Sequence, residues 1–157
     1  MSLVTLPESK LHLRVTDSEE DALIGVYITA AEQMAIALLD RGVYADGTAL
    51  GVAKAAAPGE LETASVVYDA AIEAAQAMTD AALQAAATQT AENAWLKACV
   101  THRQTMDGMV VNEVIKSAVL LIVGHLYANR EDVVAGASVA QLPNGAEWLL
   151  APYRVYA

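Results

Sequence analysis

The residues of this sequence that could act chemically are few, and the first to consider is a cysteine–histidine pair. Cys99 is the single cysteine of the chain, and His102 follows it three residues later, one turn along a helix. A thiolate activated by a neighbouring imidazole is the nucleophile of some hydrolases, but that chemistry also needs an orienting third group and an oxyanion site. The local sequence contains no motif for either. A buried helix cysteine is therefore the favoured interpretation, and a thiol hydrolase is the alternative.

Metal binding and the other common catalytic arrangements find little support in the remaining residues. His12 and His125 stand alone, without a second histidine, a cysteine or an acid at the spacing of a metal site. The sequence also contains no glycine-rich phosphate loop, no nucleophile elbow and no paired-carboxylate motif. We therefore expect a protein that is not an enzyme and that holds no metal and no cofactor.

The element around which the chain is organised is the segment 112–131, which contains His125. Its apolar residues recur at steps of three and four, which places them on one face of a helix. Asn112 is a suitable N-cap, and the uncharged run within the segment is far shorter than the roughly 20 residues that cross a bilayer. The helix is therefore predicted to be buried in the protein. Its expected core residues are Ile115, Val119, Ile122, His125 and Leu126.

Capping signals predict two helices before this segment. Thr5, followed by Pro7 and Glu8, has the pattern of a capping box that starts a short helix. Asp17 is the expected cap of a second helix over about 18–39, which carries a broad apolar stripe. From 41 to 59, glycines and a proline interrupt the pattern, which indicates a short hairpin or an irregular loop.

The middle of the chain is an alanine-rich stretch, 60–93, that keeps helical spacing without proline or glycine. The helical pattern continues to Met106 and ends at the Asp-Gly pair that follows. We expect an arm over 60–107, helical with at most one break, because alanine has the highest helix propensity. The charges between 60 and 93 are all acidic. The arm is predicted to pack against a neighbouring subunit, and an exposed helix without a partner is the alternative.

The composition indicates an all-α fold, a small helical domain with this long arm and an extended C-terminal tail. At 157 residues the length fits a single domain over 1–157, and the chain is 55% hydrophobic, with many alanines and no phenylalanine. The formal net charge of −10 argues against a protein that grips nucleic acid through its phosphates. The lone cysteine, and the lack of a signal-peptide pattern or a membrane segment, indicate the cytoplasm.

Two stretches resemble the head–tail connector, or adaptor, family of long-tailed siphophages. The opening VTLPESKLHLRVTDSEEDALIGVYITAAEQM is similar to the start of these proteins, with a capped short helix and a long amphipathic helix. The closing signature is more specific and comprises VIKSAVLLIVGHLYANRE followed by LPNGAEWLLAPYRVY. The residues that match it are Gly124, His125, Tyr127, Asn129, Arg130, Leu142, Pro143, Leu149, Leu150, Pro152, Tyr153 and Arg154. The middle, about 44–107, departs from the family pattern, so the arm is either an insertion or an elaborated version of the connection that the family has there.

The resemblance implies a structural virion protein at the head–tail junction, assembled in the host cytoplasm. Such a subunit forms a homo-oligomeric ring below the phage portal, extends the DNA channel and offers a platform for the stopper or tail-completion protein. DNA would pass through the ring without sequence-specific binding, and acidic walls suit that passage because like charges repel. The alternative is a small helical adaptor or regulator that binds a host partner through the arm.

The C-terminal segment, 142–157, is predicted to dock on another subunit or on the portal. It contains a short helix, 146–151, that ends at Pro152, and an extended tail with few neighbours to bury it. Tryptophan, tyrosine and arginine contribute most to interface energies, and they cluster here. The expected contact residues are Trp148, Leu149, Pro152, Tyr153, Arg154 and Tyr156. Alternatively, Trp148 and Leu149 close the core over the central helix while the tail frays.

Overall fold

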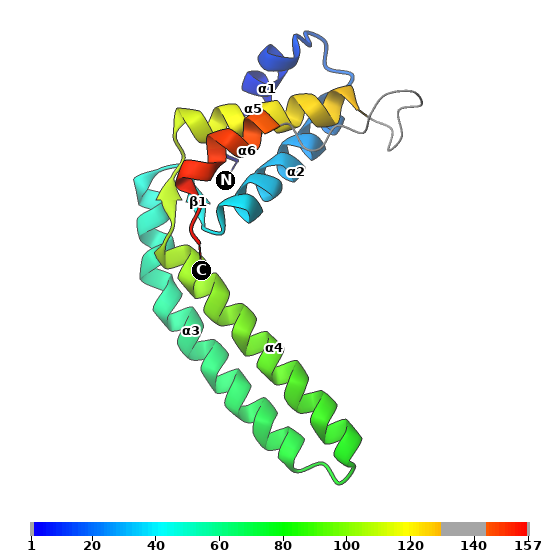
Figure 1. The fold of residues 1–157 in the computed structure, drawn as a ribbon, viewed down its shortest axis with the longest axis vertical. Coiled ribbons are helices and arrows are strands. Elements are labelled where there is room, and N and C mark those ends of the chain that lie inside the picture. Colours follow the sequence, from blue (N-terminus) through cyan, green and yellow to red (C-terminus); the bar gives the residue numbers. More distant parts are fainter. Residues whose placement is uncertain (1, 130–143, 157) are drawn as a thin grey trace. The chain divides into compact units, whose positions relative to one another are not determined.

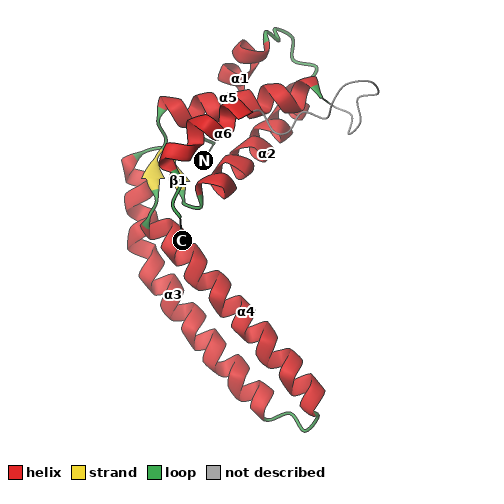
Figure 2. Ribbon diagram, in the orientation of Figure 1, coloured by secondary structure: helices red, strands yellow, loops and turns green. Residues whose placement is uncertain are grey.

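The protein is helical almost throughout, as predicted. The computed structural model describes residues 2–129 and 144–156, and this part contains six α-helices, one 3-10 helix and two strands of two residues each (Figure 1, Figure 2). The chain forms two compact units, residues 1–47 with 109–157 and residues 48–108. The predicted arm over 60–107 lies within the second unit. That both units act as one connector domain over 1–157 stays a prediction.

The first unit begins with the capped helix that the sequence predicts. Helix α1 spans Leu6–Leu13, and Thr5 is its N-cap. The capping box is complete, because Thr5 Oγ1 accepts from the Glu8 amide at 3.3 Å and Glu8 Oε2 accepts from the Thr5 amide at 2.6 Å. Helix α1 contacts α5, where a side-chain carbon on Gly124 would lie 3.3 Å from Nε2 of His12. The glycine therefore leaves room for the histidine.

The capping box gives a pH-dependent contribution to stability. Hydrogen bonds from Thr5, with a smaller effect of Lys116, hold the pKa of the Glu8 carboxyl below its usual value. A lowered folded-state pKa means stability that is present above the unfolded pKa of about 4.3 and lost as the pH falls through the folded value.

We expect Glu8→Gln to lower the free energy of unfolding by about 0.5 kcal/mol at pH 7, a modest loss because the Glu8 side chain is 42% exposed. The difference should vanish below the folded pKa, where Glu8 is also neutral. Urea unfolding of the variant and the unmodified protein, from pH 7 down to below the folded pKa of Glu8, measures the difference in the free energy of unfolding. A loss that stays constant down to acidic pH would contradict this assignment.

Helix α2 spans Asp21–Leu39 and begins about three residues later than predicted. Asp17 does not cap it, since its Oδ1 accepts from the Glu19 amide at 3.2 Å, and the actual N-cap Glu20 makes no side-chain cap bond. In the described part of the chain, α2 is the one helix that length and composition would allow to cross a membrane. A core helix passes the same test, and one face of α2 lies in the core against α5.

The segment after α2 differs from the prediction of a hairpin or an irregular loop. Strand β1, Val43–Tyr44, pairs in parallel with β2, Met109–Val110, and helix α3 already begins at Gly47. Pro58 lies inside this helix, although proline and glycine normally disfavour helix. The alanines around it have the highest helix propensity and offset that cost. The two strands belong to the first unit and flank residues 48–108 in the sequence.

The core of the first unit is built around helix α5, Glu113–Ala128, which packs against α2 and α6. Asn112 caps it as predicted, with Oδ1 accepting from the Ile115 amide at 2.9 Å. Of the residues expected in the core, Leu126 packs at its edge and His125 is half-buried. The other three, Ile115, Val119 and Ile122, are fully buried.

The second unit is a pair of long helices with one break, as predicted for the arm. Helix α3 spans Gly47–Gln76 and α4 spans Ala81–Met106, and the two run side by side in opposite directions (Figure 1). Asp80 caps α4, because its Oδ1 accepts from two amides of the first turn. The rings of Tyr68 and Trp95 pack across the pair with centroids 5.8 Å apart. The buried residues described in this unit are all small: Ala57, Ala75 and Ala91, with Gly108 at its end.

Candidate interaction surfaces

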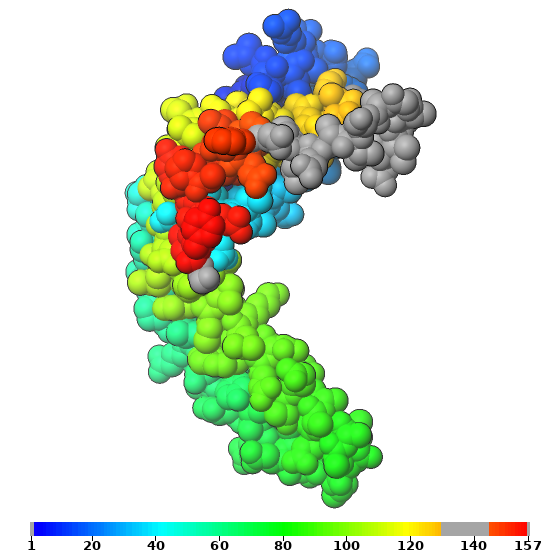
Figure 3. Space-filling view, in the orientation of Figure 1, coloured from blue at the N-terminus to red at the C-terminus, as the bar shows by residue number. Residues whose placement is uncertain are grey.

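The C-terminal segment has one side in the core and one side exposed. Helix α6 spans Asn144–Leu150, and a 3-10 helix, η1, follows over Ala151–Tyr153. Ala146 and Leu150 are buried against the core, whereas Trp148 on the same short helix is 79% exposed. The segment lies on the surface of the first unit, shown in orange and red in Figure 3. Its exposed side is therefore available to another molecule.

The tail beyond Pro152 is extended, as predicted, but it has more neighbours than the sequence indicates. The Val155 amide donates to the Leu39 carbonyl at 2.9 Å, and the Arg41 guanidinium donates to the Tyr153 carbonyl at 3.4 Å. The Arg154 guanidinium carbon lies 5.1 Å from the centre of the Tyr156 ring, a cation–π distance. Backbone hydrogen bonds thus hold the tail and leave its side chains to project from the surface.

The six predicted contact residues fall into two groups. Leu149 and Tyr153 are half-buried and pack against the core, as the alternative interpretation expected for Leu149. The exposed group comprises Trp148, Pro152, Arg154 and Tyr156. Three residues of the closing signature, Arg130, Leu142 and Pro143, lie outside the described residues.

The arm carries large apolar side chains in contact with water. They include Val66 and Val67 on α3 and Leu83, Leu96 and Val100 on α4, each between 44% and 64% exposed. Helix faces of this kind are stabilised in most proteins by burial against another element. The acidic residues of the arm are also exposed, namely Glu60, Glu62, Asp69, Glu73, Asp80 and Glu92. The arm thus combines an apolar surface with a single sign of charge along most of its length.

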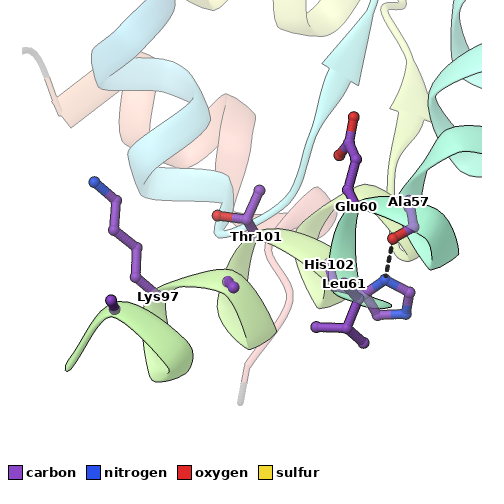
Figure 4. A pocket seen from close by; sticks show the side chains of 8 residues that line it. Ala57, Glu60, Leu61, Lys97, Thr101 and His102 are labelled. Carbon is purple, nitrogen blue, oxygen red and sulfur yellow. Dashed lines mark hydrogen bonds between the residues drawn. The ribbon is translucent and has the colours of Figure 1, made fainter. Parts of the chain in front are cut away.

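A hollow of about 290 Å³ lies between α3 and α4. Sequence reasoning missed it, because it arises where small residues of two distant segments face each other. Figure 4 shows Glu60, Lys97 and Thr101 extending to the same side of the two helices. The lining residues are Ala57, Glu60, Leu61, Ala94, Lys97, Ala98, Thr101 and His102. The lining is largely apolar, with charged groups at its rim.

Cys99 and His102 both lie on α4, and His102 lines this hollow. Nδ1 of His102 lies 3.2 Å from the carbonyl oxygen of Ala57, which orients the ring toward α3 (Figure 4). Cys99 is half-buried. The described residues contain no group of three or more His, Cys, Asp or Glu side chains that could hold a metal ion.

We expect Cys99 to react with an alkylating agent no faster than a free thiol, because its partial burial limits access to the sulfur. Mass spectrometry of the native protein with iodoacetamide measures the rate, and the urea-unfolded protein and glutathione serve as controls. A rate well above that of glutathione would reopen the hydrolase alternative.

The comparison with known families places these surfaces in context. No curated protein and no solved structure matches the chain significantly. A family model described as phage gp6-like head–tail connector protein matches residues 3–154. The match runs through the middle of the chain, about 44–107, where the sequence departs from the usual pattern of the family. The chain therefore belongs to the family of phage gp6-like head–tail connector proteins.

Proposed function

We propose that this chain is the subunit of a homo-oligomeric ring that binds below the portal of the capsid. The ring extends the DNA channel and offers a platform for the stopper or tail-completion protein. The observation that carries the proposal is the family match over 3–154, which spans nearly the whole chain. The helical fold and the exposed aromatic residues of the C-terminal segment support it.

The charge of the chain suits a wall along which DNA moves. A net charge of −10 repels the phosphate backbone, so DNA would pass the ring without being held. The protein would then act as a virion component at the head–tail junction, assembled in the host cytoplasm before it meets the capsid. This role needs no catalysis and no cofactor.

The C-terminal segment and the arm are the surfaces through which the ring would form and attach. Arg154 and Tyr156 project from a backbone that is already held in place, so little ordering is needed when a partner binds. A guanidinium can bind a carboxylate of the portal with two hydrogen bonds. The exposed apolar side chains of the arm would be covered by a neighbouring subunit.

The double variant Arg154→Ala/Tyr156→Ala should bind portal-bearing particles at least about tenfold more weakly, since exposed aromatic and arginine side chains carry much of the energy at interfaces. Co-sedimentation with purified particles measures this binding. The matched control is Leu11→Ala, which removes another exposed side chain, 81% accessible, from the same unit. Unchanged binding of the double variant would remove the tail from the attachment surface. Absence of binding by the unmodified protein would contradict the proposed function itself.

A further inference from the structure

We propose that Trp148 of one copy inserts into the hollow between α3 and α4 of a second copy. The contact is head to tail, because the inserted side chain and the hollow belong to different units of the chain. The inference rests on the proposed ring and names the contact that would link its subunits.

The inserting group is the most exposed aromatic side chain in the described residues. Trp148 is 79% exposed, and the buried residues Ala146 and Leu150 fix the face of α6 from which it projects. An indole can bury roughly 150–250 Å² and loses little conformational freedom when it binds. Tryptophan in a pocket is accordingly the most frequent kind of residue to dominate an interface.

The hollow has the size and lining that one indole needs. Its volume is about 290 Å³. Drug-sized ligands generally occupy pockets of about 300–1,000 Å³, whereas a cavity of about 150 Å³ already accepts benzene. The alanines at 57, 94 and 98 create the space. Glu60 at the rim offers an acceptor for the indole N–H, which can only donate.

The charges around the two surfaces are complementary. Glu147, which is exposed, precedes Trp148, and the exposed Lys97 stands at the rim of the hollow. Insertion of the tryptophan would bring these two side chains to opposite sides of one contact. Such pairs contribute mainly orientation and the choice of partner.

The arrangement fits a second copy of this chain because every copy carries one exposed Trp148 and one hollow. A contact between two different surfaces repeats from subunit to subunit, and it generates a ring when the rotation closes. A symmetric dimer would instead use one surface twice.

The test is crosslinking between two differently tagged versions of the full chain, both with Cys99→Ser. One carries Glu147→Cys, and the other carries Lys97→Cys or, as the matched control, Glu73→Cys, which lies further along the arm and is also exposed. The two are mixed with portal-bearing particles and treated with a short bismaleimide. We expect mixed crosslinks from Lys97→Cys at least about tenfold above those from Glu73→Cys.

Two further substitutions decide whether the indole and the hollow carry the contact. Trp148→Ala should weaken crosslinking roughly thirtyfold, the effect of losing a dominant interface residue. Ala94→Leu, which fills the hollow from an exposed helix position, should do the same, and Ala86→Leu, an exposed alanine elsewhere on α4, should not. Crosslinking that equals the Glu73→Cys control, or that survives both substitutions, overturns the inference. If rings form on the portal without this crosslink, the inference is wrong and the proposed function stands. If the crosslink forms but rings do not, the contact stands and the proposed ring is wrong.

Discussion

Leu150→Ala should lower the free energy of unfolding by about 2–5 kcal/mol, the usual cost of removing a buried leucine side chain. Leu150 is 2% exposed and holds α6 against the core of the first unit. The loss has two sources, the transfer of fewer apolar atoms from water and the cavity that remains. Chemical unfolding followed by circular dichroism measures the change.

The matched control is Trp148→Ala, two residues away on the same helix. Because its side chain is exposed, the substitution should change stability by less than about 0.5 kcal/mol. The pair separates the two interpretations of this segment. A large loss for Trp148→Ala would mean that the indole supports the fold and would contradict its assignment to a partner.

Shortening the arm should weaken ring assembly at least about tenfold while leaving the first unit folded. Every residue of the apolar core in that unit comes from outside 48–108, so its stability does not depend on the arm. The arm, by contrast, has exposed valines and leucines that a neighbouring subunit would bury.

Contacts between α3 and α4 define where the arm can be shortened. Ala57 lies opposite His102 and Tyr68 lies near Trp95, so removal of 70–93 with a glycine-rich turn keeps both pairs and the register of the remaining helices. Negative-stain microscopy and sedimentation give ring content and subunit mass. Undiminished ring formation would contradict a role of the arm between subunits and would favour the alternative that it binds another partner, such as a host protein. An unfolded variant would show that the first unit needs the arm.

Local signals identify most of the fold because they act within a few residues. Thr5 and Asn112 cap their helices as expected, since each cap depends on a side chain and an amide three residues away. The break in the arm and its helical character also follow from alanine propensity and from Asp80. These features need no knowledge of tertiary contacts.

The segment 41–59, predicted as a hairpin or an irregular loop, depends in part on a partner that is distant in sequence. Val43 belongs to a strand because it pairs with Met109, sixty-six positions along the chain, which the local glycines cannot indicate. Pro58 lies in a helix because its neighbours favour helix strongly enough to offset it. Tyr153 packs against the core because α6, which precedes it, contacts α5. The tail therefore has contacts that its own sequence does not predict.

The sequence predicts which residue types form the interaction surfaces, but it does not predict which of these side chains are exposed. The clustering of tryptophan, tyrosine and arginine marked the C-terminal segment, but only packing separates exposed Trp148 from half-buried Leu149 beside it. The hollow between α3 and α4 has no local signal, because Ala57 and Ala98 line it from two different helices. Surfaces built from distant segments require the fold.

The most direct measurement is cryo-electron microscopy of purified portal-bearing capsids mixed with this protein. The account predicts a ring of helical subunits below the portal, continuous with the DNA channel, with the C-terminal segments at subunit or portal contacts. Portal vertices that stay bare at saturating protein concentration, or density that attaches elsewhere on the capsid, would contradict it.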